Sequence, residues 1–232
     1  MIDTLVRVKI WGRRAVYTRP EFKVERISYE VPTAAALRGT LDAIYWHPPF
    51  SWEIREVWVL NPIRTFSVVR NEVRMKNHAG FHAAMERVEG ISEGYVVDND
   101  RTPRHTRGLK DVAYLVVAEP VERPGFTGDI PKYLAMFRRR VELGQCFHHP
   151  YLGCREFAAD FAPPSGDERP QPYTMELDRM FFDFVTVLGE GGQVFREDPR
   201  FFQARLEEGI LRFPRELYQG LYRRKEDGHV GC

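Results

Sequence analysis

Residues 29–74 read YEVPTAAALRGTLDAIYWHPPFSWEIREVWVLNPIRTFSVVRNEVR and contain one helix followed by two strand-like runs. Thr33 can start the helix, because its hydroxyl can accept a hydrogen bond from a free backbone N–H. The apolar positions that follow at helical spacing are Ala34, Leu37, Leu41 and Ile44. They form a single apolar face, so we expect this helix to pack on a sheet.

The end of the helix is set by Pro48 and Pro49, since proline lacks the backbone donor and clashes with the preceding turn. Tyr45, Trp46 and His47 are therefore held at the C-terminus of the helix, where polar side chains can meet a ligand. Gly39 is a poor helix former, and we expect it to permit a close approach to the sheet.

Strand-like runs flank this helix on both sides. Residues 4–11 and 22–31 alternate apolar and polar positions, which is typical of half-buried strands. Residues 51–60 and 63–73 are predicted to be two further strands, separated by the break at Asn61-Pro62. Residues 76–103 are polar, contain glycine and show no period, so we interpret them as a long insertion.

Residues 105–119 end in the most strand-like run of the chain, 112–117, and a second helix follows. Asp129 can cap this helix, Pro131 suits an early position and Gly144 suits its end. The order strand, helix, strand, strand, strand, helix approximates the ferredoxin-like pattern within an α+β fold. Residues 175–188 and a hairpin at 201–213, turning at Glu208-Gly209, predict an appended antiparallel sheet. We thus expect one domain at 1–145 and a C-terminal sheet region at 146–232.

Composition limits the class of protein. The 232 residues carry a net charge of +1 and are 43% hydrophobic, as in an ordinary soluble globular protein. The apolar runs are too short to cross a bilayer, and the N-terminus lacks a signal-peptide layout. The three cysteines, Cys146, Cys154 and Cys232, are too few for a disulfide framework. We therefore expect a cytoplasmic protein without a membrane partner.

Motifs for phosphate, dinucleotide or metalloprotease chemistry are missing from the sequence, and no carboxylate cluster fits a two-metal nuclease. Cys146, His148, His149 and Cys154 are all residue types that ligate zinc, but their C-x-HH-x₄-C spacing is not a familiar zinc motif. A buried turn is the favoured interpretation, and we expect neither a metal nor a cofactor.

The run VPTAAALRGTLDAIYW at 31–46, followed by VLNPI and RNEV, resembles the Cas-five family of CRISPR-associated proteins. The similarity is greatest to the type I-C variant (the d or Dvulg subtype) and follows the order of motifs over most of the chain. This resemblance implies a fold of the RAMP group, which is RRM-like. It also implies a metal-independent endoribonuclease that cleaves precursor CRISPR RNA.

The resemblance also implies a catalytic set. In the family, a tyrosine at the end of the first helix and a Lys-His pair before a late strand form the cleavage site. Tyr45 matches the tyrosine, and Arg104-His105 stands where the pair is expected, with arginine in place of lysine. His105 could act as base or acid in attack by the RNA 2′-hydroxyl, leaving a 2′,3′-cyclic phosphate. Arg104 could stabilise charge but could not shuttle protons.

Basic and aromatic side chains on the same strands and loops are candidates for binding the RNA. The set is Arg7, Lys9, Trp11, Arg13, Arg14, Tyr17, Arg26, His47, Arg64, Arg70 and Arg107. The cations could follow the phosphate backbone, and Trp11 and Tyr17 could stack on bases. His47 is also a spare acid or base.

The resemblance further implies that the enzyme stays on the 5′ handle of the processed CRISPR RNA. It would then be a subunit of the type I-C interference complex, beside the backbone and large subunits. Two alternatives stay open: a module that binds the RNA handle without cutting it, and a protein that binds double-stranded DNA through its basic face. Steep salt dependence shared by unrelated sequences would indicate the last.

Overall fold

A computed structural model describes residues 4–22, 24–73, 101–189 and 194–224, and it confirms the α+β class. The strands are β1 (Val6–Ala15), β2 (Arg26–Ile27), β3 (Phe50–Val59), β4 (Arg64–Val73), β5 (Arg101–Glu122), β6 (Asp160–Ala162), β7 (Met175–Leu188), β8 (Val194–Glu207), β9 (Ile210–Arg212) and β10 (Tyr222–Arg224). The helices are α1 (Ala34–Ile44), α3 (Ile130–Glu142) and the short 3₁₀ helix η3 (Arg215–Tyr218).

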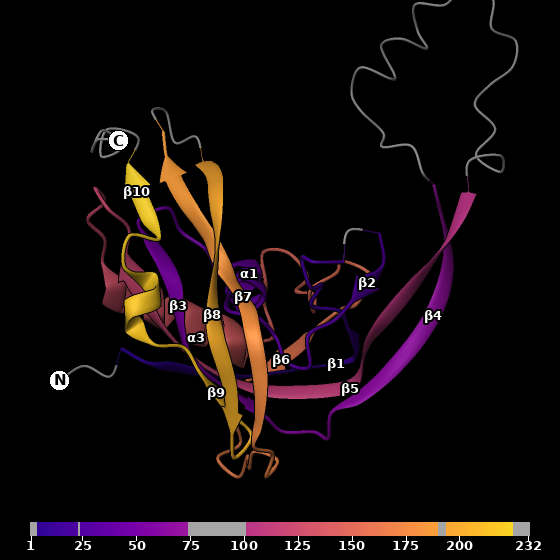
Figure 1. Ribbon diagram of the computed structural model, residues 1–232. Coiled ribbons are helices and arrows are strands. Elements are labelled where there is room, and N and C mark those ends of the chain that lie inside the picture. The colour runs from indigo at the N-terminus through magenta and orange to yellow at the C-terminus, as the bar shows by residue number, and fades with distance from the viewer. Residues whose placement is uncertain (1–3, 23, 74–100, 190–193, 225–232) are drawn as a thin grey trace, which may run out of the picture.

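One curled sheet runs through both halves of the chain (Figure 1). Its strand order is β10-β7-β8-β9-β3-β5-β1-β6, and β2 and β4 pair with β5 outside this path. The predicted C-terminal sheet is therefore continuous with the first one, because β9 pairs with β3. It also departs from a purely antiparallel sheet, since β10 pairs parallel to β7. The division near residue 145 stays a prediction.

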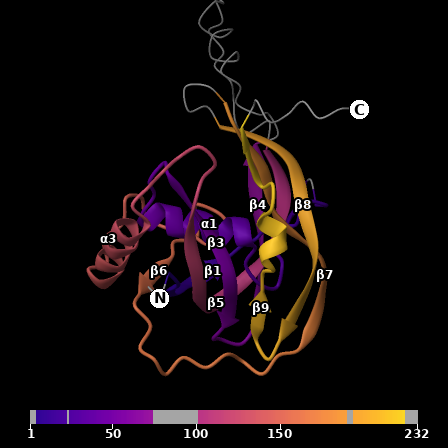
Figure 2. The same cartoon turned by 90° about the vertical axis from the view of Figure 1, so that its left-hand side faces the viewer.

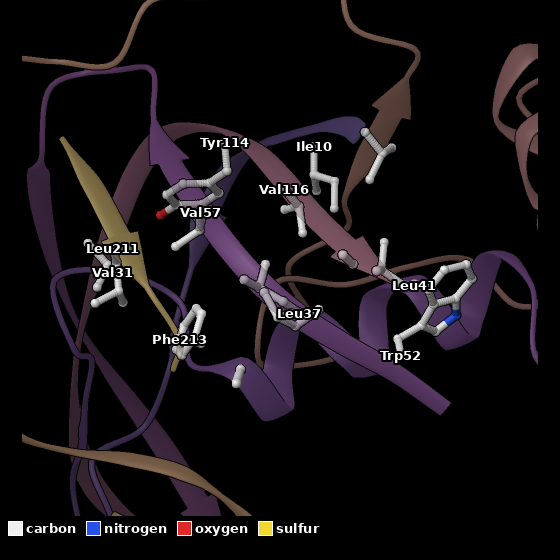
Figure 3. Packing of buried hydrophobic residues seen from close by; sticks show 14 of the residues in the cluster. Ile10, Val31, Leu37, Leu41, Trp52, Val57, Tyr114, Val116, Leu211 and Phe213 are labelled. Carbon is white, nitrogen blue, oxygen red and sulfur yellow. The ribbon is translucent and has the colours of Figure 1, made fainter. Parts of the chain in front are cut away.

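The apolar face predicted for α1 is confirmed, with Ala34, Leu37, Leu41 and Ile44 all buried. Leu37 and Leu41 pack over β3 and β5 beside Trp52 and Val116 (Figure 3). Figure 2 shows α1 between α3 on one side and the β7–β8 ribbon on the other. None of the helices in the described ranges combines the length and the apolar character needed to cross a membrane.

The strand β5 is 22 residues long and belongs to two parts of the molecule. Its second half pairs with β1 and β3 beneath the helices. Its first half pairs with β4 from Arg64↔Lys110 to Val73↔Arg101, and this arm extends away from the helices (Figure 1). Most of the insertion predicted at 76–103 lies outside the described residues, but 101–103 belong to β5.

Two local predictions were wrong. Within 22 and 24–31 the only strand is the two-residue β2, because Tyr29 and Val31 are buried in the core and the Tyr29 hydroxyl accepts from Phe181 N at 3.1 Å. Gly39 is exposed, and a Cβ there would meet nothing within 4 Å, so no close approach requires it. By contrast, the predicted turn at Glu208-Gly209 is confirmed, with φ of 47° and 74° in a two-residue hairpin loop.

A polar loop after β6 is fixed by one buried carboxylate. Glu168 accepts hydrogen bonds from Ser165 N at 2.8 Å, from Ser165 Oγ at 2.8 Å and from Gly166 N at 2.9 Å. Lys9 Nζ lies 3.9 Å from the same carboxylate. Burial opposes ionisation of Glu168, yet these hydrogen bonds outweigh it and lower its pKa to about 2.

The exposed position of Gly39 predicts that Gly39→Ala stabilises the protein. Alanine suits a helix better than glycine, so the free energy of unfolding should rise by about 0.5–1 kcal/mol. Thermal or urea unfolding measures this. Gly153→Ala is the matched control and should destabilise, because Gly153 has φ of +82° and its Cβ would clash with Val16 O. A lower free energy of unfolding for Gly39→Ala than for the wild type would contradict the exposed position of Gly39 on α1.

The lowered pKa of Glu168 predicts acid sensitivity. Its ionised form stabilises the fold above the unfolded pKa, near 4.3, and this contribution is lost as pH falls toward 2. Urea unfolding from pH 6 to pH 2 should show a steeper loss of stability in the wild type than in Glu168→Gln. Equal slopes for the two proteins would contradict it.

Candidate functional site

The C-terminal end of α1 is built as the sequence predicts. Thr33 Oγ1 accepts from Ala36 N at 3.2 Å at the start of the helix. At the other end Tyr45 caps the helix in an extended conformation, and its N–H donates to Leu41 O at 2.9 Å. Tyr45, Trp46 and His47 therefore lie between the helix and Pro48-Pro49, with Tyr45 buried and Trp46 and His47 exposed.

The Tyr45 ring lies in an aromatic stack below the surface. It stacks on Phe50 at 6.0 Å and lies 6.5 Å from Tyr133 of α3. The Arg140 guanidinium lies over it, 4.9 Å from the ring centroid, and Arg140 Nη1 donates to Ile44 O at 2.7 Å. Burial raises the pKa of Tyr45 and Arg140 offsets part of this effect, so the phenol keeps its proton at neutral pH.

An exposed imidazole completes this arrangement. His47 stacks on Tyr133 with 4.9 Å between ring centroids, at the start of α3. Asp129 Oδ1 caps α3 by accepting from Lys132 N at 3.1 Å, and the side chain of Lys132, which precedes Tyr133 in the sequence, is exposed. We call Tyr45, His47, Tyr133 and Arg140 the helix-end cluster. It brings together an exposed imidazole, two phenols and a guanidinium that a hydrogen bond holds in place.

Arg104 and His105 lie elsewhere, on the β4–β5 arm. His105 is exposed opposite Val69, and Arg104 Nη1 lies 3.5 Å from Glu72 Oε2. The Tyr45 ring contacts Phe50, which pairs with Glu122 at the far end of β5. Positions 105 and 122 are 17 residues apart in β5, a contour length of roughly 55 Å for extended backbone, although Asp111 between them has φ of 53°. The expected cleft shared by Tyr45, Arg104 and His105 is therefore wrong, because its two halves lie toward opposite ends of β5.

The predicted RNA-binding residues fall into three groups. Tyr17 is 3% exposed and lies edge-on to Tyr114 at 6.4 Å, so it has no open face for a base and that prediction was wrong. Several cations already have partners: Lys9 with Glu168, Arg26 with Glu72 and Glu156, Arg70 with Glu156, and Arg14 over the Phe66 ring. Arg7, Arg13, Arg64 and Arg107 are exposed, and His47 belongs to the helix-end cluster.

Trp11, Lys9 and Arg13 share a groove on the face of β1 away from the core. It has a volume of about 590 Å³, and Asp111 and Asp160 also line it. These carboxylates, with Glu168 beside Lys9, reduce the positive potential of the groove. The three residues remain candidates, on a less basic surface than the sequence indicated.

Sequence reasoning missed Tyr133 and Arg140 as site residues. Tyr133 falls on the apolar face of its helix and so resembles an ordinary core residue. Arg140 lies in the last turn, where a cation is favoured by the helix dipole alone. The packing of α3 against the end of α1 depends on tertiary structure, and helical spacing carries no signal of it.

Comparison with known proteins places the chain in a family. The family model described as "CRISPR-associated protein (Cas_Cas5)" matches residues 5–214. A protein of Thermus thermophilus named "CRISPR pre-crRNA endoribonuclease Cas5d" is 43% identical over 237 residues, covering 97% of each chain. A protein of the same name from Mannheimia succiniciproducens is 40% identical over 214 residues, covering 90% of this chain and 94% of its own.

Solved structures agree on the fold. The crystal structure of a CRISPR-associated protein superposes with a TM-score of 0.64 at 23% identity, covering 90% of this chain and 91% of its own. The protein SMU1763c from Streptococcus mutans gives a TM-score of 0.63 at 24% identity, covering 90% and 92%. With the family match over 5–214 and relatives at 40% identity or more across nearly their whole length, the chain belongs to the Cas5 family of CRISPR-associated proteins.

Proposed function

We propose that the protein is an endoribonuclease that cleaves precursor CRISPR RNA within its repeats at the helix-end cluster. Relatives that share 40–43% of its residues carry that activity in their names. The observation that supports this location is the stacking of the exposed His47 on Tyr133, beside Tyr45 and Arg140. These groups supply the functions that cleavage by the RNA's own 2′-hydroxyl requires.

The proposed reaction needs no metal ion. His47 takes the proton from the 2′-hydroxyl, whose oxygen attacks the adjacent phosphorus while the bond to the 5′-oxygen breaks. Lys132, in the positive first turn of α3, and Arg140 stabilise the charge that develops on the phosphoryl oxygens. Tyr45, whose phenol keeps its proton, can transfer that proton to the leaving 5′-oxygen, and Tyr133 can donate a hydrogen bond to a phosphate oxygen. The products are a 2′,3′-cyclic phosphate and a 5′-hydroxyl.

The arm and the groove on β1 would hold RNA away from the cut. Arg64 and Arg107 are exposed on β4 and β5, and Arg104-His105 lies farther along the same arm. We infer that these residues contact the RNA backbone or the neighbouring subunits of a type I-C interference complex. Through these contacts the protein would stay bound to the 5′ handle of the processed RNA after cleavage.

Two finer inferences accompany this proposal. We infer a ferredoxin-like core from the antiparallel order β3-β5-β1-β6, with α1 and α3 as the two connecting helices. We infer a cytoplasmic location, which the free thiols of Cys146 and Cys154 support.

Substitution of each candidate histidine in turn should distinguish a cleavage site at the helix-end cluster from a cleavage site on the arm. His47→Ala should lower the rate constant for cleavage of repeat RNA by ~100-fold or more, since a general acid or base is lost. His105→Ala should change it by less than about 5-fold. Single-turnover assays in EDTA measure both. If His105→Ala abolished cleavage while His47→Ala preserved it, the site would be on the arm.

Tyr45→Phe tests the phenol without removing the ring. The stack on Phe50 stays, so stability and RNA affinity should change little, whereas the cleavage rate should fall about 10-fold or more. Product-end analysis should still show 2′,3′-cyclic phosphate. An unchanged rate would remove Tyr45 from the chemistry.

The binding-module alternative predicts a different pattern. Wild-type protein would bind repeat RNA with high affinity in EDTA and leave it intact. Binding to double-stranded DNA would instead show a steep salt dependence common to unrelated sequences.

A further inference from the structure

A second group of side chains meets at the end of α1, next to the helix-end cluster. Trp46, directly after Tyr45, is 46% exposed. The Arg123 guanidinium lies 5.7 Å from the Trp46 ring centroid and 5.7 Å from that of Tyr222. The backbone N–H of Arg123 donates to Pro49 O at 2.9 Å, which fixes the arginine beside the turn that ends the helix.

The charge of Arg123 is only partly compensated by the described part of the chain. Its Nε is buried and has no hydrogen-bond partner among those residues, so a ligand would have to meet the terminal N–H groups of the guanidinium. Asp183 is held by Arg38 through two hydrogen bonds of 2.8 and 2.9 Å. Asp42 Oδ2 lies 3.5 Å from Arg38 Nη1, and burial raises the pKa of Asp42 to about 6. Both carboxylates are therefore engaged by Arg38, and the charge of Asp42 also acts on Arg123.

The arrangement resembles what single-stranded RNA recognition requires. Unstacked bases bind on aromatic faces or guanidinium planes, and phosphates bind to cations. Burial lowers the pKa of Arg123 but leaves it charged at physiological pH, as arginine does in proteins. The exposed indole offers a surface for a base, and the neighbouring guanidinium offers donors for a phosphate.

We propose that Trp46 and Arg123 bind one nucleotide of the repeat RNA beside the scissile phosphate, with its base on the indole and its phosphate on the guanidinium. The inference rests on the proposed function, because one peptide bond separates Trp46 from Tyr45. It adds a specificity subsite: a base that can be unstacked and splayed onto Trp46 favours cleavage at the adjacent bond.

The test is a binding cycle that does not depend on cleavage. Repeat RNA in which 2′-deoxynucleotides block attack is prepared with an abasic site at each position in turn. Its affinity for wild type and Trp46→Ala is measured by fluorescence anisotropy. On intact RNA, Trp46→Ala should weaken binding by roughly 10-fold. At one abasic position the variant should bind as the wild type does, because the base that Trp46 holds is already gone.

Arg123 is tested by salt dependence. Arg123→Ala should reduce the slope of log affinity against log salt by about one, and Arg123→Lys should restore the slope but not the full affinity. Phe22→Ala, which removes an aromatic ring that is 41% exposed, and Arg205→Ala, on the exposed face of β8, are matched controls that should leave the affinity unchanged. Thermal unfolding verifies that the variants fold.

The outcomes separate the two proposals. The subsite proposal would be overturned if Trp46→Ala bound intact RNA as tightly as the wild type. It would also be overturned if Trp46→Ala weakened binding by the same factor at every abasic position as on intact RNA. Failure of the wild type to bind RNA would overturn it as well. If all-ribose RNA is bound but never cut, the enzymatic proposal fails while the binding cycle still decides the subsite.

Discussion

An aromatic stack at the end of α1 fixes the geometry on which the candidate site depends. Trp52 packs against Phe137 at 4.6 Å and against Phe50 at 5.1 Å, and Phe50 stacks on Tyr133 at 5.3 Å. Trp52 Nε1 also donates to Tyr45 O at 3.2 Å. These contacts join α1, β3 and α3 at one point. Because Pro48-Pro49 ends the helix there, Tyr45 and His47 are presented at this junction, and their positions follow from the packing beneath them.

The length of β5 is the second constraint. The second half of this 22-residue strand belongs to the core and its first half belongs to the arm. Residues in the first half can therefore lie far from the helices although they are close in sequence to the core. Arg104 and His105 illustrate this separation. Their basic and titratable character suits RNA contact, but the β4–β5 ladder holds them away from Tyr45. We therefore propose that cleavage takes place at the ends of the helices and that the arm binds the RNA backbone.

Much of the fold could be predicted from the sequence. The cap at Thr33, the apolar face of α1 and the turn at Glu208-Gly209 depend on local chemistry, and each is confirmed. Residues 22–31 alternate as a strand does, yet Tyr29 turns inward to bond Phe181 N, a contact 152 positions away in the chain. Local periodicity carries no information about such a distant partner, and the same holds for the pairing of β9 with β3 that makes the sheet continuous.

The candidate site was partly predictable, because two prolines stop the helix beside Tyr45 and His47. Tyr133, Arg140 and Arg123 were not, since each looks structural until α3 and the end of β5 meet α1.

The proposed mechanism requires the scissile phosphate to bind at the end of α1. The most direct measurement is photo-crosslinking of repeat RNA that carries 4-thiouridine at the nucleotide preceding the mapped cut, with peptides identified by mass spectrometry. Binding of the scissile phosphate at the end of α1 predicts cross-links to residues 45–47 or 132–133. Cross-links confined to residues 101–107 of the arm would contradict it.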